Sequence, residues 1–333
     1  MRKQLSPPVE VYDMRTAKRL LLLGLVFLLL LAVGFFAGCA SLHESVRIDD
    51  PPRFETLPPN PSSGMTSKPM VALVLSGGSA RGFAHLGVIK VLEEIGLIPD
   101  LIVGVSAGSM AGVAYASGMS AQQLMDASAK LDTLLMTDFT MPNLGQPILR
   151  RELGFIQGER LQAFVNQLVA NRPLQALPRK ITIVATDLQS GKTVAFTQGN
   201  AGMAVRASSA VPGVFVPPLI AGKLYVDGKV SSPLPVAMAR MLGATTVIAV
   251  DATFPPEQAV ISNTSSVLFQ SFTIATQRIK DQELGQATLV IRPAINSPLQ
   301  LGFGDRAWII DAGEKAARKV LPELLKILAS QPM

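Results

Sequence analysis

The pentapeptide Gly104–Gly108 reads Gly-Val-Ser-Ala-Gly and places a serine between an apolar strand, Leu101–Val103, and a helix of small residues. A serine on such a strand-to-helix turn projects from the backbone with its hydroxyl exposed. The flanking glycines, Gly104 and Gly108, let the strand and the helix approach closely enough for the turn to form. The hydroxyl of Ser106 is therefore a candidate nucleophile.

A second glycine-rich turn lies upstream, where Gly77–Gly82 reads Gly-Gly-Ser-Ala-Arg-Gly between an apolar strand and a helix. The backbone N–H groups of Gly77, Gly78 and Ser79 are candidate donors to an oxyanion, so the two turns together indicate acyl transfer. Such a turn is also able to cradle phosphate, but this one lacks the Gly-Lys-Ser/Thr ending of a nucleotide loop, so we expect no nucleotide. Arg81 would either contact a lipid phosphate or hold the loop by pairing with a carboxylate.

A serine nucleophile needs a group that accepts its proton, and histidine is the usual one. The chain has only two histidines. His43 falls in a proline-rich stretch, and we expect His85 to be a structural helix histidine that bonds a backbone carbonyl or packs beside the sheet. The alternative base is a carboxylate at the end of a strand. Asp227, at an Asp-Gly turn, is the best candidate, but Asp187 and Asp251 also end strands, and spacing alone leaves all three open.

Three of these segments together resemble the patatin-like phospholipase family, in its bacterial branch: Ser76–Gly82, Gly104–Gly108 and the Asp-Gly pair at 227–228. The resemblance implies a Ser-Asp dyad in place of a triad, with Ser106 as the nucleophile and Asp227 as its partner. It also implies that the glycine loop is the oxyanion hole. The activity implied is that of a serine hydrolase of lipid acyl esters, of the phospholipase or lysophospholipase type.

The resemblance extends from about Val71 to Gly243 and has two departures. Ser79 stands where the family usually has a third glycine, and its N–H remains usable if the local φ is accessible to a non-glycine residue. Lys229 follows the Asp-Gly pair where the family has glycine or alanine. An ammonium there favours an ionised Asp227 but is also able to draw it away from Ser106. The alternative function is accordingly a non-catalytic lipid-binding lipoprotein with a compromised dyad.

Residues 1–38 resemble a bacterial lipoprotein signal peptide. Basic residues precede an apolar run, Leu20–Phe36, and small residues then lead to the single cysteine, which predicts lipidation at Cys39. The alternative is an uncleaved anchor, because the apolar stretch is just long enough to span a bilayer. Alanine rather than aspartate at position 40 favours the outer membrane. We expect a membrane-tethered protein of the cell envelope that faces the periplasm; the alternative is a single-pass anchor in the inner membrane.

The alternation of apolar strands and helices predicts a three-layer α/β sandwich with a central, mostly parallel sheet of the patatin-like type. We expect a proline-rich spacer over 39–69, a catalytic domain over 70–243 and an α/β extension over 244–333 that packs on the same core.

The composition of the chain limits the classes of partner that we expect it to bind. The chain has 333 residues and is 48% hydrophobic, enough for one sizeable core. Its net charge is +6, and residues 1–38, with five basic and two acidic residues, carry half of that charge. No basic stripe with interleaved aromatic residues is present, so we expect no nucleic acid. Because the chain has one cysteine, it cannot form an intrachain disulfide. No cluster of Cys, His and Asp residues has the spacing of metal ligands, so we expect no metal or cofactor. The expected partners are a lipid acyl-ester substrate and a membrane.

Overall fold

The computed structural model of the chain describes residues 70–131, 138, 153–295 and 303–330. Its strands are β1 (Val71–Leu75), β2 (Leu101–Val105), β3 (Ile181–Asp187), β4 (Thr193–Phe196), β5 (Leu219–Ile220), β6 (Lys223–Asp227), β7 (Thr246–Val250) and β8 (Leu289–Ile291). Its α-helices are α2 (Ala84–Glu94), α3 (Ala107–Ala116), α4 (Ala121–Ala129), α7 (Glu159–Leu168), α8 (Ala201–Ser208), α9 (Val236–Met241), α10 (Thr264–Leu284) and α11 (Arg306–Ala329). Short 3₁₀ helices include η1 (Ser79–Phe83) and η3 (Gly228–Val230).

The strands form one sheet in the order β5-β6-β3-β2-β1-β7-β8, with β4 also paired to β3. The pairs β1–β2, β1–β7, β2–β3 and β7–β8 are parallel. The pairs of β3 with β4, β3 with β6 and β5 with β6 are antiparallel. The predicted α/β sandwich with a mostly parallel sheet is therefore confirmed.

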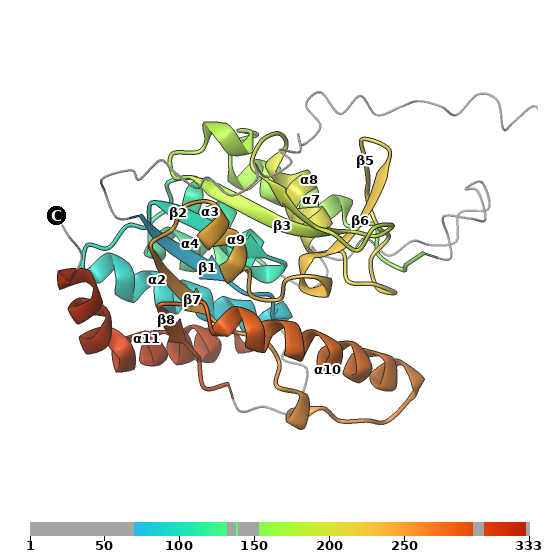
Figure 1. The fold of residues 1–333 in the computed structure, drawn as a ribbon. Coiled ribbons are helices and arrows are strands. Elements are labelled where there is room, and N and C mark those ends of the chain that lie inside the picture. The colour runs from blue at the N-terminus through green and yellow to red at the C-terminus, as the bar shows by residue number, and fades with distance from the viewer. Residues whose placement is uncertain (1–69, 132–137, 139–152, 296–302, 331–333) are drawn as a thin grey trace, which may run out of the picture. The chain divides into compact units, whose positions relative to one another are not determined.

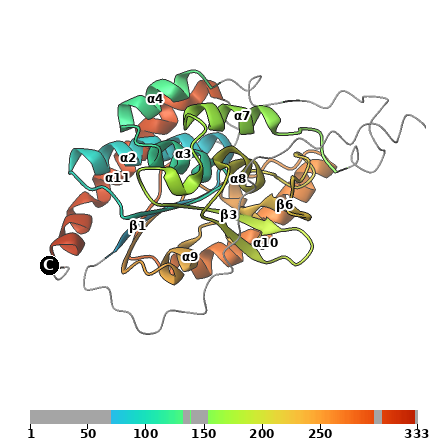
Figure 2. The same cartoon turned by 90° about the horizontal axis from the view of Figure 1, so that it is seen from above.

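Helices cover both faces of the sheet (Figures 1 and 2). Figure 2 shows α2, α3, α4, α7 and α11 on one side of the strands and α9 with α10 on the other. Every residue of β1, β2 and β7 is buried. This explains why these strands are continuous apolar runs rather than alternating patterns, because a parallel strand covered on both faces has no polar side.

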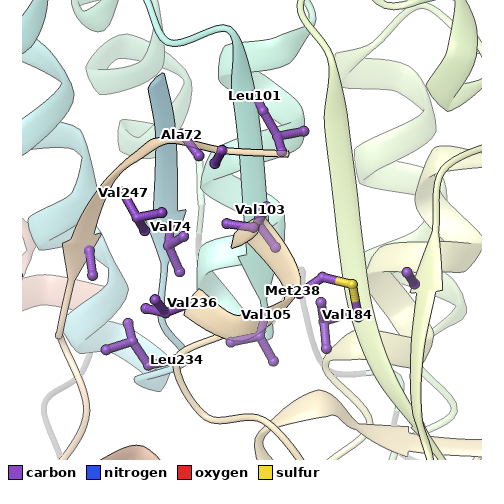
Figure 3. Close-up of a cluster of buried hydrophobic side chains, with 14 residues drawn as sticks. Ala72, Val74, Leu101, Val103, Val105, Val184, Leu234, Val236, Met238 and Val247 are labelled. Atoms are coloured by element: carbon purple, nitrogen blue, oxygen red, sulfur yellow. The ribbon is translucent and has the colours of Figure 1, made fainter. Parts of the chain in front are cut away.

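Alternate residues of the central strands form the core beneath α9 (Figure 3). Ala72 and Val74 of β1 lie in this cluster with Val103 and Val105 of β2. Val247 and Ala249 of β7 join it, and α9 with the turn before it covers it through Leu234, Val236, Met238 and Ala239. Strand β7 lies directly beside β1, so segments before and after residue 243 share one sheet and one core.

The opposite layer is held by close contact between α2 and α11, and two glycines permit it. A Cβ at Gly87 of α2 would overlap with the carbonyl oxygen of Ile310 in α11. A Cβ at Gly313 of α11 would overlap in the same way with the carbonyl oxygen of Ala84 in α2. The two backbones therefore touch, and since α2 follows η1 directly, α11 supports the helix that continues the glycine-rich turn.

We predict that Gly87→Ala lowers the free energy of unfolding by about 1–3 kcal/mol, because the added methyl group has rigid backbone as its neighbour. Chemical denaturation of the two proteins measures the difference. Gly285→Ala is the matched control, since its Cβ would lie 3.6 Å from the nearest atom, the carbonyl oxygen of Gln282, and should cost little. Equal stability of the two variants would contradict the tight contact between α2 and α11.

Candidate active site

Ser106 lies between β2 and α3 with φ 53° and ψ −125°. This is a left-handed region that a residue with a side chain rarely adopts, so the turn is strained. Glycines on either side make it possible. A Cβ at Gly104 would lie 2.6 Å from the carbonyl oxygen of Gly108, and a Cβ at Gly108 would overlap with the backbone of Leu75 at the end of β1. The side chain of Ser106 is 8% exposed.

A second serine holds this strained turn. The hydroxyl of Ser208, at the end of α8, accepts the backbone N–H of Ser106 at 2.8 Å and donates to the carbonyl of Val184 at 2.6 Å. Ser208 is fully buried. The sequence analysis did not identify this role of Ser208. The feature that could have indicated it is the Ala-Ser-Ser-Ala segment at 207–210, which is made of small residues and contains two hydroxyl groups.

Asp227 ends strand β6 and lies within the sheet, opposite Ala185 of β3. Its N–H donates to the carbonyl of Ala210 at 2.9 Å, and Thr186 donates its hydroxyl to the Asp227 carbonyl at 3.0 Å. The next residue must be glycine, because a Cβ at Gly228 would overlap with the carbonyl oxygen of Val184. The Asp-Gly pair thus places a carboxylate close to the β2–α3 turn.

The side chains of Ser106 and Asp227 meet. Asp227 is 2% exposed, and its carboxylate accepts a hydrogen bond from the backbone N–H of Lys229 at 2.8 Å. Burial raises the pKa of Asp227 to about 6, while the N–H of Lys229, the nearby hydroxyl of Ser106 and the charge of Lys229 act in the opposite direction. A carboxylate of this pKa is a better proton acceptor than an exposed aspartate.

The ammonium of Lys229 lies against an aromatic ring of α10. Its Nζ is 5.6 Å from the ring centroid of Phe272, and burial lowers the pKa of Lys229. Lys229 bonds the Asp227 carboxylate through its backbone N–H, and the carboxylate remains near the Ser106 hydroxyl.

The two competing carboxylates have other partners. Asp187 accepts the N–H groups of Gln189 and Ser190, both at 3.0 Å, and these bonds within the β3–β4 turn hold its pKa below the usual value despite its burial. Asp251 forms ion pairs with Lys280 at 3.2 Å and Arg292 at 3.6 Å. Both residues therefore stabilise neighbouring loops.

His85 is fully buried on α2, and its Nε2 donates to the carbonyl of Ser76 at 2.9 Å. Burial lowers the pKa of His85 to about 4. It is thus a neutral histidine that bonds a backbone carbonyl at the end of β1, as the sequence analysis expected. His43 lies outside the described residues.

The glycine-rich turn packs against the nucleophile turn. A Cβ at Gly77 would lie 3.2 Å from the Ser106 Cβ, and one at Gly78 would lie 2.5 Å from the carbonyl oxygen of Ala252. Ser79 has φ 49°, so the position usually held by glycine does adopt a left-handed conformation here. Among the hydrogen bonds of the described residues, none uses the N–H of Gly77, Gly78 or Ser79.

Arg81 holds this turn in place. Its guanidinium donates to the carbonyls of Ala252 at 3.2 Å and Ile295 at 3.0 Å, and it lies 5.6 Å from the ring centroid of Phe254. Of the two roles considered for Arg81, loop support is the one observed, although its acceptors are backbone carbonyls rather than a carboxylate. The loop therefore depends on segments that follow β7 and β8.

An apolar cavity of about 300 Å³ opens beside Ser106. Its wall comes from η1, α3, α4 and α7, together with the segment after α8. The lining residues include Met110, Ala114, Leu124, Leu161, Phe164 and Phe215. Ser79, Ser106, Ser128 and Ser209 also line it, so the cavity combines the Ser106 hydroxyl with a mainly apolar wall.

The described residues contain neither a metal-binding cluster nor a membrane-spanning helix. No group of His, Cys, Asp and Glu side chains among them has the arrangement of a metal site. None of the helices that the structure describes combines the length and apolarity needed to cross a bilayer. The predicted signal peptide, spacer and Cys39 lie outside these residues.

Comparison with known proteins agrees with this architecture. Residues 73–240 match the model of the patatin-like phospholipase family, and the chain therefore belongs to that family. An uncharacterized NTE family protein of Mycobacterium tuberculosis is 38% identical over 185 residues, which cover 56% of this chain and 49% of the relative. Patatin-like phospholipase domain-containing protein 6 of Mus musculus is 34% identical over 186 residues, covering 54% of this chain and 13% of that protein.

Among solved structures, VipD from Legionella pneumophila aligns with a TM-score of 0.48 and 15% identity. The alignment covers 77% of this chain and 67% of VipD. The chain spans about half the length of the first curated relatives it matches.

We predict that Ser79→Gly raises the free energy of unfolding by about 1 kcal/mol, because glycine adopts the left-handed φ of this position without a clash between its Cβ and the backbone. Ser79 is exposed, so little packing is lost. Ser79→Val should lower the free energy of unfolding, since a β-branched residue is least tolerant of positive φ. Thermal or chemical denaturation measures both, and the reverse order would contradict the backbone conformation described for the glycine-rich turn.

Proposed function

We propose that the chain is a serine hydrolase of lipid acyl esters that works through a Ser106–Asp227 dyad. The observation that carries the proposal is the position of the Ser106 hydroxyl, which lines an apolar cavity and lies close enough to the buried carboxylate of Asp227 to lower its pKa. Membership of the patatin-like phospholipase family supports the same class of reaction. His85 donates its Nε2–H to the carbonyl of Ser76 and is not the proposed base, so the proposal assigns that role to Asp227.

In the proposed reaction, Ser106 Oγ attacks the ester carbonyl while its proton passes to Asp227. The oxyanion of the tetrahedral intermediate accepts hydrogen bonds from the N–H groups of Gly77, Gly78 and Ser79. The leaving alcohol takes the proton back from Asp227, and an acyl-serine remains. Water then attacks the acyl group, gives its proton to Asp227, and the fatty acid leaves as Ser106 recovers its proton.

The cavity supports a lipid rather than a small polar ester. Its interior is formed by aliphatic and aromatic side chains, including Leu124, Leu161 and Phe164, so an acyl chain would bury its methylene groups there. Ser106 in the cavity wall would meet the ester carbonyl at the head of that chain. We propose phospholipids or lysophospholipids as the substrate class.

The alternative of a non-catalytic lipid-binding lipoprotein depends on Lys229 drawing Asp227 away from Ser106. The Lys229 ammonium lies beside Phe272, and the Asp227 carboxylate lies near the Ser106 hydroxyl, which favours the enzyme.

Labelling with a fluorophosphonate probe tests the nucleophile. We expect the wild-type protein to be labelled and Ser106→Ala to lose both labelling and ester hydrolysis, the latter by more than about a thousandfold, because no other group forms the covalent intermediate. Ser117→Ala, at the far end of α3, is the matched serine control and should keep its labelling. A wild-type protein that neither reacts with the probe nor hydrolyses acyl esters would favour the lipid-binding alternative.

The pH dependence tests the base. Because Asp227 accepts a proton only when ionised, and burial raises its pKa to about 6, kcat/KM should fall roughly tenfold per pH unit below about pH 6. Above that value the activity should reach a plateau. Asp227→Asn should be inactive across the whole range while remaining folded by circular dichroism. Full activity maintained at pH 4.5 would exclude Asp227 as the base.

For the location of the enzyme, we propose that residues 1–38 direct the chain to the cell envelope and that Cys39 carries a lipid. The support is the order of basic, apolar and small residues before that cysteine. A lipid tether facing the periplasm would bring a phospholipase next to its substrate.

A further inference from the structure

The start of α10 and the segment before it expose apolar side chains. Leu268 is 67% exposed, Val260 61% and Ile261 52%. We call this surface the α10 apolar end and define it by its six exposed residues: Val260, Ile261, Val267, Leu268, Phe269 and Ile274. Single exposed apolar residues are ordinary on protein surfaces, but six within fifteen positions form a patch that needs an explanation.

Polarity changes along the solvent-facing side of α10. Its first half presents Val267, Leu268 and Ile274, whereas its last two turns present Arg278 and Asp281. The stretch from 258 to 277 contains no charged residue. From Val267 to Arg278 the helix rises by about 16 Å. The surface thus passes from apolar to charged in one direction along the helix.

The α10 apolar end lies at the edge of the sheet that carries the dyad. Strands β2 and β7 both run parallel to β1, so Ser106, after β2, and the chain after Val250 leave the sheet at the same edge. Figure 1 shows the start of α10, in orange, extending past this edge. Phe272 of α10 contacts Lys229, whose backbone N–H donates to Asp227. One side chain therefore separates α10 from the proposed base.

We propose that the α10 apolar end inserts into the acyl layer of the lipid surface from which the enzyme takes its substrate. This inference rests on the proposed function, because a lipid surface is the occupant that a lipid hydrolase must meet at this edge. The gradient along α10 matches an environment whose polarity changes in one direction. A protein partner would not require such a gradient, and the absence of charge over 258–277 means that insertion does not need anionic lipids.

Tryptophan quenching by brominated lipids measures the contact directly. The full-length protein carries Ser106→Ala, to prevent hydrolysis, and Trp308→Phe, which removes its single tryptophan. Leu268→Trp then reports from the α10 apolar end. Ile98→Trp is the matched control: Ile98 is 57% exposed and precedes β2, at the opposite edge of the sheet. Each protein is mixed with phosphatidylcholine vesicles, either plain or brominated at mid-chain.

We expect brominated vesicles to reduce the emission of Leu268→Trp by at least a third and to leave Ile98→Trp unchanged. Similar quenching at both positions, or none at Leu268→Trp while the protein co-sediments with the vesicles, would overturn the proposal. A concentration-dependent dimer that Leu268→Asp dissociates would also overturn it, because the patch would then be an interface between copies of this chain.

Rates of hydrolysis on two kinds of substrate test this inference separately from the proposed function. In the otherwise wild-type protein, Leu268→Asp should lower the rate on phosphatidylcholine vesicles about tenfold and leave the rate on a dissolved short-chain ester unchanged. Ile98→Asp should change neither rate. Loss of both rates in Leu268→Asp would contradict a role confined to the lipid surface. If the wild-type protein hydrolyses neither substrate, the proposed function fails, while the quenching measurement still decides whether α10 enters the lipid.

Discussion

The architecture of the site depends on backbone contacts that only glycine permits. Gly104 and Gly108 allow β2, the turn and α3 to approach the end of β1, and Gly228 allows the Asp227 turn to approach β3. A single Cβ at any of these positions would separate the elements that bring Ser106 and Asp227 together. The strain at Ser106, with φ 53°, is sustained by the same contacts and by the hydrogen bond from its N–H to Ser208.

Burial raises the pKa of Asp227 and so determines how readily its carboxylate accepts a proton. Asp227 lies in the sheet with almost no exposure, so its pKa rises, and a residue that would be a weak base in water becomes a suitable proton acceptor. The backbone N–H of Lys229 and the hydroxyl of Ser106 limit this rise in pKa. The only described histidine, His85, is committed to the carbonyl of Ser76, where it steadies the strand end that leads into the glycine-rich turn.

The segments after residue 243 take part in the site as well as in the core. Arg81 anchors the glycine-rich turn to the carbonyls of Ala252 and Ile295, which follow β7 and β8. Phe272 of α10 receives the ammonium of Lys229, the residue that departs from the family pattern. The helix that contacts the lysine beside the dyad also carries the α10 apolar end, so the site and the proposed lipid contact lie on neighbouring surfaces.

The sequence by itself determined the features that depend on neighbouring residues: the apolar parallel strands, the two glycine turns and the α/β class. Each follows from local sterics or from the burial of one strand. Spacing alone left three carboxylates as candidates for the partner of Ser106, and only the tertiary structure separates them. Asp187, Asp227 and Asp251 all end strands, but Asp187 bonds its own turn, Asp251 pairs with Lys280 and Arg292, and Asp227 lies near the Ser106 hydroxyl. The role of Ser208 and the exposure of α10 were equally beyond local reasoning, because a hydrogen bond across 102 residues and an uncovered helix face depend on how distant segments pack.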